Sequence, residues 1–197
     1  MKLQKIMRKI KNFKVNLSLK EISCAVKRLV NNDDIMVEAK ETIQQCSRFY
    51  VKFLSPAIIY ETFSKETLPF AYEKTTPLKW FAESVFFVTI GNDLCEEYKK
   101  NEEAFGKYTG KVVSAISVDA LRQSKNFVQR LISNEAKAEN CEISKVSDIP
   151  RNLYSEFAKI IHIDKIGISV ESGNFQPKYS FCGLFYWIPS RKKQKNK

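Results

Sequence analysis

Residues 84–90 read SVFFVTI, an apolar run that predicts the clearest strand of the chain, and Gly91–Asn92 ends it. Other short runs with the same character predict further strands: 57–63 (AIIYETF), 165–171 (KIGISVE) and 179–188 (YSFCGLFYWI). The last two runs are neighbours in the chain. The turn residues between them predict a hairpin: Gly173, Asn174 and Pro177.

Helical periodicity fills most of the chain between these strands. Ser18, with Glu21 in the position of a capping box, predicts a helix that ends near residue 31. Apolar residues three and four apart predict further helices over 36–50, 92–103 and 109–138, and one that Pro150 opens. Residues 64–79 are rich in Thr, Lys and Pro and predict a loop. Because helices precede the first clear strand and two strands come last, we expect an α+β fold with helices packed on a mixed or antiparallel twisted sheet.

The net charge of +11 is concentrated at the two ends of the chain. Residues 1–14 hold six Lys and Arg and no acid, residues 191–197 hold five, and residues 15–190 are balanced. We therefore predict a basic N-terminal arm (1–14), a single domain (15–190) and a basic disordered tail (191–197). Leu3, Ile6 and Ile10 fall on one helical stripe, as in an amphipathic arm, but we expect a frayed terminus or a short first element here instead.

Charge and cysteine usage narrow the class of protein. The balanced charge of residues 15–190 argues against a nucleic-acid groove on the folded body, so nucleic acid is not an expected partner. The five cysteines are odd in number and lack C-x-x-C spacing, which favours reduced thiols in a cytoplasmic protein. We expect Cys141 to be the most exposed of them. With His162 as the only histidine, a His-rich metal site is excluded, and no apolar run is long enough to span a membrane.

No local motif points to a catalytic residue. The sequence lacks GxxxxGK[ST], G-x-G-x-x-G, G-x-S-x-G and H-E-x-x-H. Structural roles explain the polar residues of the predicted helices better than catalytic roles do. His162 falls at a helix end, Asp93 at a helix start, and Ser114 and Ser117 allow close packing along the long helix. From the residues alone we therefore expect neither a catalytic group nor a metal site.

Several segments, taken in order, resemble one family: the activation domain of cobalamin-dependent methionine synthase and its stand-alone bacterial relatives. They are NLSLKEISCAVKRL (16–29), VKFLSPAIIYETF (51–63), FFVTIGNDLCEEYKK (86–100), GKVVSAISVDALRQSKNFVQRLI (110–132) and FAKIIHIDKIGISVESGNFQPKYSFCGLFYWIP (157–189). The shared order and spacing cover residues 15–189. The resemblance implies the fold of that family, in which helices pack on a sheet.

The resemblance also implies an S-adenosylmethionine site that is eroded. The family carries a loop like Arg-x-Ser-Pro-Gly-Tyr-Gly-Asp before a helix led by Pro. The matching residues 141–148 (CEISKVSD) keep a Ser and an Asp but lose the Arg and the Gly–Tyr pair, whose glycine lets a backbone approach a ligand closely. The family's Thr-Glu-Ser is Val-Glu-Ser here, and an Arg replaces a family Glu on the long helix. The candidate ligand-binding residues are thus Arg122, Ser144, Lys145, Asp148, Glu171 and Ser172.

The function implied by the resemblance is that of a stand-alone accessory protein for reductive reactivation of a cobalamin-dependent methyltransferase. In the family, the activation domain presents S-adenosylmethionine to cobalamin that another domain carries. We therefore expect a corrinoid-carrying methyltransferase subunit as partner, an electron-donor protein beside it, and no catalysis by the chain alone. The alternatives are a non-enzymatic binding module, for an anionic ligand or for nucleic acid held by the basic tails, and a structural paralogue without a ligand.

Overall fold

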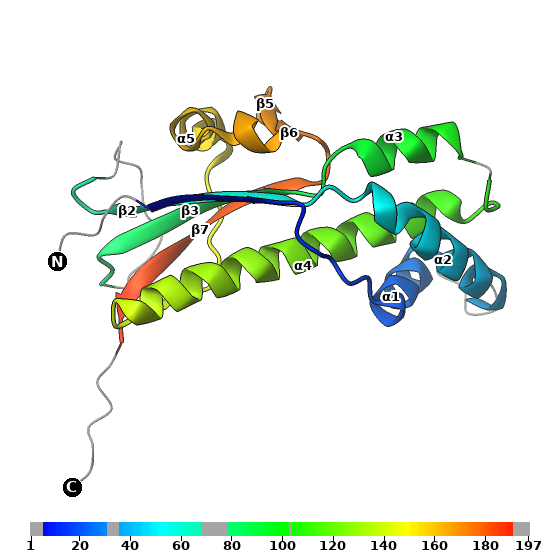
Figure 1. The fold of residues 1–197 in the computed structure, drawn as a ribbon, viewed down its shortest axis with the longest axis horizontal. Coiled ribbons are helices and arrows are strands. Elements are labelled where there is room, and N and C mark those ends of the chain that lie inside the picture. Colours follow the sequence, from blue (N-terminus) through cyan, green and yellow to red (C-terminus); the bar gives the residue numbers. More distant parts are fainter. Residues whose placement is uncertain (1–5, 31–35, 68–78, 103, 191–197) are drawn as a thin grey trace, which may run out of the picture.

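The computed structural model describes residues 6–30, 36–67, 79–102 and 104–190, and it has an α+β architecture (Figure 1). Five strands form one sheet in the order β1-β2-β3-β7-β4, and every neighbouring pair is antiparallel. The strands are β1 (Ile6–Lys11), β2 (Ala57–Ser64), β3 (Ala82–Thr89), β7 (Ser180–Pro189) and β4 (Cys141–Ile143). The expected fold class, helices packed on an antiparallel sheet, is confirmed.

The helices begin and end close to the residues that the sequence indicates. They are α1 (Leu19–Val30), α2 (Met36–Tyr50), α3 (Asp93–Lys100), α4 (Thr109–Ala138) and α5 (Tyr154–Ile161), with short 3-10 helices η1 (Val51–Phe53), η2 (Arg151–Leu153) and η3 (Ile163–Ile166). The backbone N–H of Glu21 donates to the Ser18 hydroxyl over 3.3 Å, which confirms Ser18 as the cap of α1. His162 closes α5 in a left-handed conformation, with φ 57°, so it does stand at a helix end.

The sheet is covered on both faces, so its central strands are apolar throughout. Helix α4 lies along one face, while α5 and a small hairpin, β5 (Ser169–Glu171) and β6 (Asn174–Gln176), lie on the other (Figure 1). Every residue of β3 is buried, and so is β2 up to its last residue. This arrangement explains the unbroken run SVFFVTI, because both sets of alternating side chains need apolar partners.

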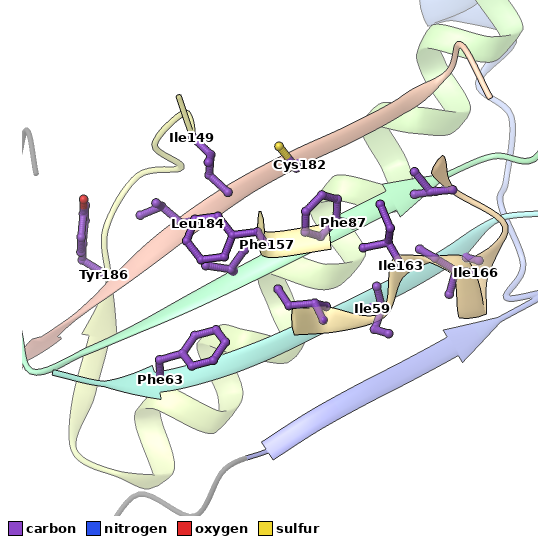
Figure 2. Packing of buried hydrophobic residues seen from close by; sticks show 14 residues of the cluster. Ile59, Phe63, Phe87, Ile149, Phe157, Ile163, Ile166, Cys182, Leu184 and Tyr186 are labelled. Atoms are coloured by element: carbon purple, nitrogen blue, oxygen red, sulfur yellow. The ribbon is translucent and has the colours of Figure 1, made fainter. Parts of the chain in front are cut away.

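The core on the α5 face joins three strands to the segment that follows β4. Figure 2 shows Ile59 and Phe63 of β2, Phe87 of β3 and Leu184 of β7 packed against Phe157 of α5. Two isoleucines of η3 complete the layer, Ile163 and Ile166. Phe157 has no exposed surface. Burial of a side chain this large stabilises a fold by about 2–3 kcal/mol, so Phe157 fixes α5 on the sheet.

The opposite face and one end of the molecule form two further clusters. Val128, Ile132 and Ala136 of α4 pack on the side chains of β2, β3 and β7 that point the other way. Beyond the sheet, the first half of α4 packs with α1, α2 and α3 around Ile22, Tyr50 and other buried residues (Figure 1). Helix α4, 30 residues long, therefore joins the sheet to the helical end.

The N-terminal arm contains a strand, which agrees with the expected short first element and not with an amphipathic helix. Residues 6–11 form strand β1, which pairs with β2 from Ile6 opposite Thr62 to Lys11 opposite Ala57. A lone helix of this length is marginal in water, whereas an edge strand gains a full ladder of hydrogen bonds. The helical stripe is therefore wrong for residues 6–11, and Leu3 lies outside the described residues. The sheet thus includes part of the expected arm, while the division of the chain at residues 14 and 190 stays a prediction.

The prediction of two strands over 165–171 and 179–188 also needs correction. Residues 163–166 form η3 rather than the start of a strand over 165–171, and Gly167 follows it with φ 73°. Only β5 remains extended, and it pairs with β6 in a separate two-stranded sheet instead of with β7. Left-handed residues at both ends of η3 turn the chain twice, and this separates β5 from the main sheet.

Strand β4 was not expected, and it overturns the exposure assigned to Cys141. This cysteine begins β4 opposite Pro189 and is only 3% exposed, because it packs into the cluster on the α4 face. The exposed cysteine of the described chain is Cys24. Most of the expected loop at 64–79 and all of the tail at 191–197 lie outside the described residues. Among the residues that are described, no helix is long and apolar enough to cross a membrane.

Candidate ligand site at the open edge of the sheet

Among the described residues, no strand pairs with the first residues of β7 on the side away from β3, whereas β4 pairs with its last residues. After β4 the chain follows β7 only as far as Ser147, whose backbone N–H and C=O both bond with Leu184, at 2.9 and 3.0 Å. In an antiparallel ladder, backbone groups two residues apart point to the same side. The N–H and C=O of Cys182 therefore point toward this same edge.

A cavity of about 480 Å³, which we name the edge cavity, lies against this part of β7. Its walls come from three places in the chain: the start of α5 and η2, the β5–β6 hairpin, and β7. The lining residues are Arg151, Tyr154, Gly173–Gln176, Lys178, Ser180, Phe181 and Cys182. The size falls within the range of small-molecule sites in proteins.

Two stacked rings form the apolar wall of the edge cavity. The rings of Tyr154 and Phe175 lie 4.7 Å apart at an interplanar angle of 20°. Phe87 in the core meets the Phe175 ring edge-on, 5.9 Å away, and so holds it in place from below. The hairpin can present Phe175 because its turn residues Ser172 and Gly173 both adopt positive φ, 50° and 74°, as a tight two-residue hairpin turn requires.

The charge in the cavity wall is positive. Arg151 and Lys178 line it, and among its described lining residues there is no carboxylate. The carboxylate of Asp148 stands nearby, because it raises the pKa of both Cys182 and Tyr154, although burial is the larger cause for each. The cavity can therefore pair with an anionic group of a ligand, and a carboxylate is available at its border.

Cys182 is a neutral thiol in this site. Burial raises its pKa to about 12; a hydrogen bond with Tyr154 acts in the opposite direction and the charge of Asp148 in the same one. A thiol with such a pKa is almost wholly protonated near pH 7, so it is a poor nucleophile. Among the described residues, no group of three or more His, Cys, Asp and Glu is placed to hold a metal ion. The chemistry that this site offers is binding rather than covalent catalysis.

Three of the six candidate residues lie near the edge cavity. Asp148 is close enough to act on Tyr154 and Cys182, which both line the wall. Glu171 ends β5 and Ser172 begins the hairpin turn, directly before the lining residue Gly173. Both are exposed. Their contribution to binding stays a prediction.

The other three candidates lie elsewhere. Arg122 is on α4, across the sheet from the cavity, and pairs with buried Asp119, whose carboxylate also accepts the backbone N–H of Ser18. Ser144 accepts the backbone N–H of Tyr186 at 3.0 Å, four residues along β7 from Cys182 or about 13 Å. Lys145 follows it and is exposed. The structure therefore does not bring these three side chains to the edge cavity.

Sequence reasoning missed the residues that form most of the cavity wall. Tyr154 was not assigned to the apolar face of its helix, and Phe175 was placed in a turn between two strands. A signal was present in the spacing, because an aromatic two residues after Gly173 in a tight hairpin returns to the core side of the turn. Cys182, Arg151 and Lys178 carry no such signal, since only the tertiary fold brings them together.

No protein-family model and no curated protein sequence matches the sequence of this chain. One solved structure with a similar fold is a crystal structure of the MetH reactivation domain bound to AdoHcy. The two share 13% sequence identity with a TM-score of 0.55, over 94% of this chain and 79% of that one. At this identity the likeness shows a common fold, in agreement with the α+β fold that the resemblance implies.

Proposed function

We propose that the chain is an accessory protein of the reactivation type, which binds an S-adenosyl ligand in the edge cavity and acts together with a corrinoid-carrying methyltransferase. One observation carries the proposal. In a chain with the fold of the AdoHcy-bound reactivation domain, a cavity opens beside two segments that the resemblance assigns to ligand binding, at Asp148 and at Glu171–Ser172.

The described residues suit the adenosyl and amino-acid parts of such a ligand. The stacked rings of Tyr154 and Phe175 offer a flat apolar surface beside which a purine can pack. Arg151 and Lys178 can pair with a ligand carboxylate, and Asp148 can accept hydrogen bonds from an amino group. The backbone N–H and C=O of Cys182 face the same opening and add directional hydrogen bonds.

The cavity suits the centre of the methyl donor less well. S-adenosylmethionine carries a positive sulfonium, which supplies an activated methyl group when it is bound, whereas S-adenosylhomocysteine has a neutral sulfur there. Arg151 and Lys178 repel a third positive charge, and no lining carboxylate offsets them among the described residues. The site therefore favours S-adenosylhomocysteine, whose sulfur is neutral, over S-adenosylmethionine. Loss of the family motif thus corresponds to weaker binding of the methyl donor.

The chain by itself binds and orients a ligand, and the chemistry requires a partner. The cysteine among the described lining residues of the edge cavity, Cys182, is a poor nucleophile because its thiol stays protonated. The proposal therefore assigns cobalamin to a separate methyltransferase subunit and the electrons to a donor protein. All five cysteines are free thiols, and together with the absent C-x-x-C spacing they support the cytoplasm as the compartment.

Calorimetric titration of S-adenosylhomocysteine and S-adenosylmethionine into the purified chain tests the ligand. We expect S-adenosylhomocysteine to bind about fivefold more tightly, the effect of roughly 1 kcal/mol of charge repulsion at an exposed site. Arg151→Gln should weaken both ligands, whereas Lys159→Gln, an exposed change on α5 outside the cavity lining, should weaken neither. The absence of heat up to millimolar ligand would remove the S-adenosyl part of the proposal.

A reactivation assay tests the accessory role separately. The probe is a cobalamin-dependent methionine synthase that lacks its own activation domain and holds oxidised, inactive cobalamin, supplied with a flavodoxin-type reductant as electron donor and S-adenosylmethionine as methyl donor. Addition of the chain should restore turnover in proportion to its concentration, because it must bind its partner in trans. If turnover stays at the level without the chain, the protein has another role, whatever the calorimetry shows.

A further inference from the structure

The largest of the cavities discussed here is on the other side of the sheet from the edge cavity. It measures about 830 Å³ and lies between α4 and the extended residues Phe13–Asn16 that follow β1. We name it the strap groove, and these four residues the strap. The lining residues from α4 are Gln123, Asn126, Phe127, Gln129, Arg130, Ser133, Asn134 and Lys137. They cover four turns of α4, about 21 Å of groove.

The strap is fixed along its whole length, so the groove is a formed feature of the fold. Before it, the backbone N–H of Asn12 donates to the Pro56 carbonyl at 2.8 Å. Within it, the ring of Phe13 packs 4.6 Å from the ring of Phe127. At its end, Asn16 and Gln123 exchange two hydrogen bonds, of 3.1 and 2.7 Å.

The lining of the strap groove is basic. Lys14, Arg130 and Lys137 line it, and among the described lining residues there is no carboxylate. The acid of α4 at the same level, Glu135, is occupied elsewhere: it pairs with Arg8 and accepts the hydroxyl of Tyr60 at 2.8 Å. Arg130 and Lys137 are seven residues apart on one helix face, about 10.5 Å. Such a row of cations fits a ligand with more than one anionic group.

The remaining lining fits a ligand that is more than an inorganic anion. Five carboxamide side chains line the groove: Asn16, Gln123, Asn126, Gln129 and Asn134. Gln123 already bonds with the backbone of Asn16 and with Asp119, and the other four each offer a donor and an acceptor to a ligand. The partly buried rings of Phe13 and Phe127 add an apolar surface at the strap. Three kinds of group recognise a nucleotide: carboxamides form hydrogen bonds with its base, a ring surface packs against the base, and cations bind its phosphates.

The chain's own ends do not suit the strap groove. Residues 191–197 carry five cations and no acid, and residues 1–5 carry two cations and no acid. Both would be repelled by Arg130 and Lys137. These two segments are therefore poor candidates to fill the groove.

We propose that the strap groove binds a nucleotide, with its phosphates on Arg130, Lys137 and Lys14 and its base beside Phe13 and Phe127. A nucleoside di- or triphosphate carries the spaced negative charges that the row of cations matches. This inference does not depend on the S-adenosyl site, which lies across the sheet and has a different lining. It makes the chain a two-ligand protein in which a nucleotide occupies the α4 side.

Calorimetric titration of ATP into the purified chain, at low and at physiological salt, tests the proposal. The double variant Arg130→Gln, Lys137→Gln should lose about tenfold or more in affinity, because each change removes a charged hydrogen bond to phosphate. The matched control is Lys125→Gln on the opposite side of α4, whose ammonium lies 3.7 Å from the Phe181 ring centre; it should change the affinity less than about twofold. Circular dichroism checks that each variant is folded; Arg130 and Lys137 are exposed and Lys125 is partly exposed, which favours this.

Three comparison ligands decide the class. Adenosine should bind far more weakly than ATP, and inorganic triphosphate should bind more weakly than ATP because it cannot use the rings and carboxamides. Equal binding of ATP and triphosphate would overturn the nucleotide proposal in favour of a general anion site. A single-stranded oligonucleotide that binds more than about tenfold tighter than ATP, with a steep salt dependence, would overturn it in favour of a nucleic-acid surface.

Competition between ATP and S-adenosylhomocysteine distinguishes the strap groove from the proposed S-adenosyl site. Saturating S-adenosylhomocysteine should leave the ATP affinity unchanged, and the double variant should bind S-adenosylhomocysteine like the unmodified chain. If S-adenosylhomocysteine displaces ATP, the two ligands share one site and the strap-groove proposal fails. If ATP fails to bind at millimolar concentration, the proposal fails as well, and the S-adenosyl test is unaffected.

Discussion

Gly183 of β7 offers a sensitive test of how the segment after β4 lies on the sheet. It is buried, and a Cβ added there would stand 2.8 Å from Cγ2 of Val146, 3.1 Å from the Phe181 ring and 3.1 Å from the Phe86 ring. The closest contact is too short for any real Cβ, and the valine that makes it has a stiff side chain. Gly183→Ala should therefore push residues 144–148 outward, at the border of the edge cavity.

The size of the effect follows from this overlap. Overpacking a well-filled core costs about 1–3 kcal/mol, so we expect Gly183→Ala to lower the free energy of unfolding by about 2 kcal/mol. For a chain of this length, that corresponds to a fall in Tm of roughly 4–8 °C. Val146 is 43% exposed, so Val146→Ala alone should cost less than about 1 kcal/mol. In the double variant the closest clash disappears, and the two costs should fall short of additivity by about 1 kcal/mol.

Urea unfolding of the four proteins in this cycle measures the coupling between Gly183 and Val146. The reference chain, both single variants and the double variant give four free energies of unfolding at a common m-value. Additivity within about 0.5 kcal/mol would mean that Val146 does not lie over Gly183. The course of residues 144–148 along β7, and the open edge that it leaves at Cys182, would then be wrong.

Further predictions concern titration, thiol access and a buried carboxylate. Burial raises the pKa of Cys46 to about 11 and that of Cys182 to about 12, from an ordinary 9.0. Above pH 9 the unfolded thiols lose protons that the folded thiols keep, so the free energy of unfolding should fall as pH rises from about 9 to about 12. Urea midpoints at about pH 7.5 and about pH 10 measure this fall, which Cys46→Ala should reduce; a flat profile would contradict it. A thiol reagent should modify exposed Cys24 at once and the three buried thiols, Cys46, Cys141 and Cys182, only after unfolding, as mass spectrometry of the labelled chain can show. Asp119→Ala should cost about 1–3 kcal/mol of unfolding free energy because the backbone N–H of Ser18 loses its acceptor, and thermal melts that show no loss would contradict this.

The elements with a strong local signal could be predicted from the sequence. The 3.6-residue period and the capping group at Ser18 placed α1, and α4 was expected with the bounds that it has. Strand β3 was found because a strand buried on both faces is apolar at every position. In each case the residues that determine the element lie within it.

The elements that failed depend on distant partners. Strand β1 has a helical period of apolar residues, and only the ladder with β2 makes it extended. Strand β4 has three residues, too few for any period, and it exists because β7 lies beside it. The strand expected over 165–171 is interrupted at Gly167, which has a positive φ. Glycine permits this conformation but does not require it, so the residue type alone does not predict the turn.

The binding role of the candidate residues stays a prediction, and the structure gives only their positions. Asp148 acts on the cavity residues Tyr154 and Cys182, and Glu171 ends β5 two residues before the lining residue Gly173. The resemblance also selected Arg122, whose position on α4 matches by alignment. The structure instead gives Arg122 a local role beside Asp119. An alignment transfers a position along the helix, but only the contacts decide what the side chain does there.

An NMR titration of the ¹⁵N-labelled chain with S-adenosylhomocysteine tests whether this ligand binds in the edge cavity. We predict that the backbone signals of Gly173–Gln176, Tyr154 and Cys182 shift together and saturate, while those of Arg130 and Lys137 in the strap groove stay in place. Shifts confined to the strap groove, or no saturable shift at millimolar ligand, would contradict an S-adenosyl site at the open edge of β7.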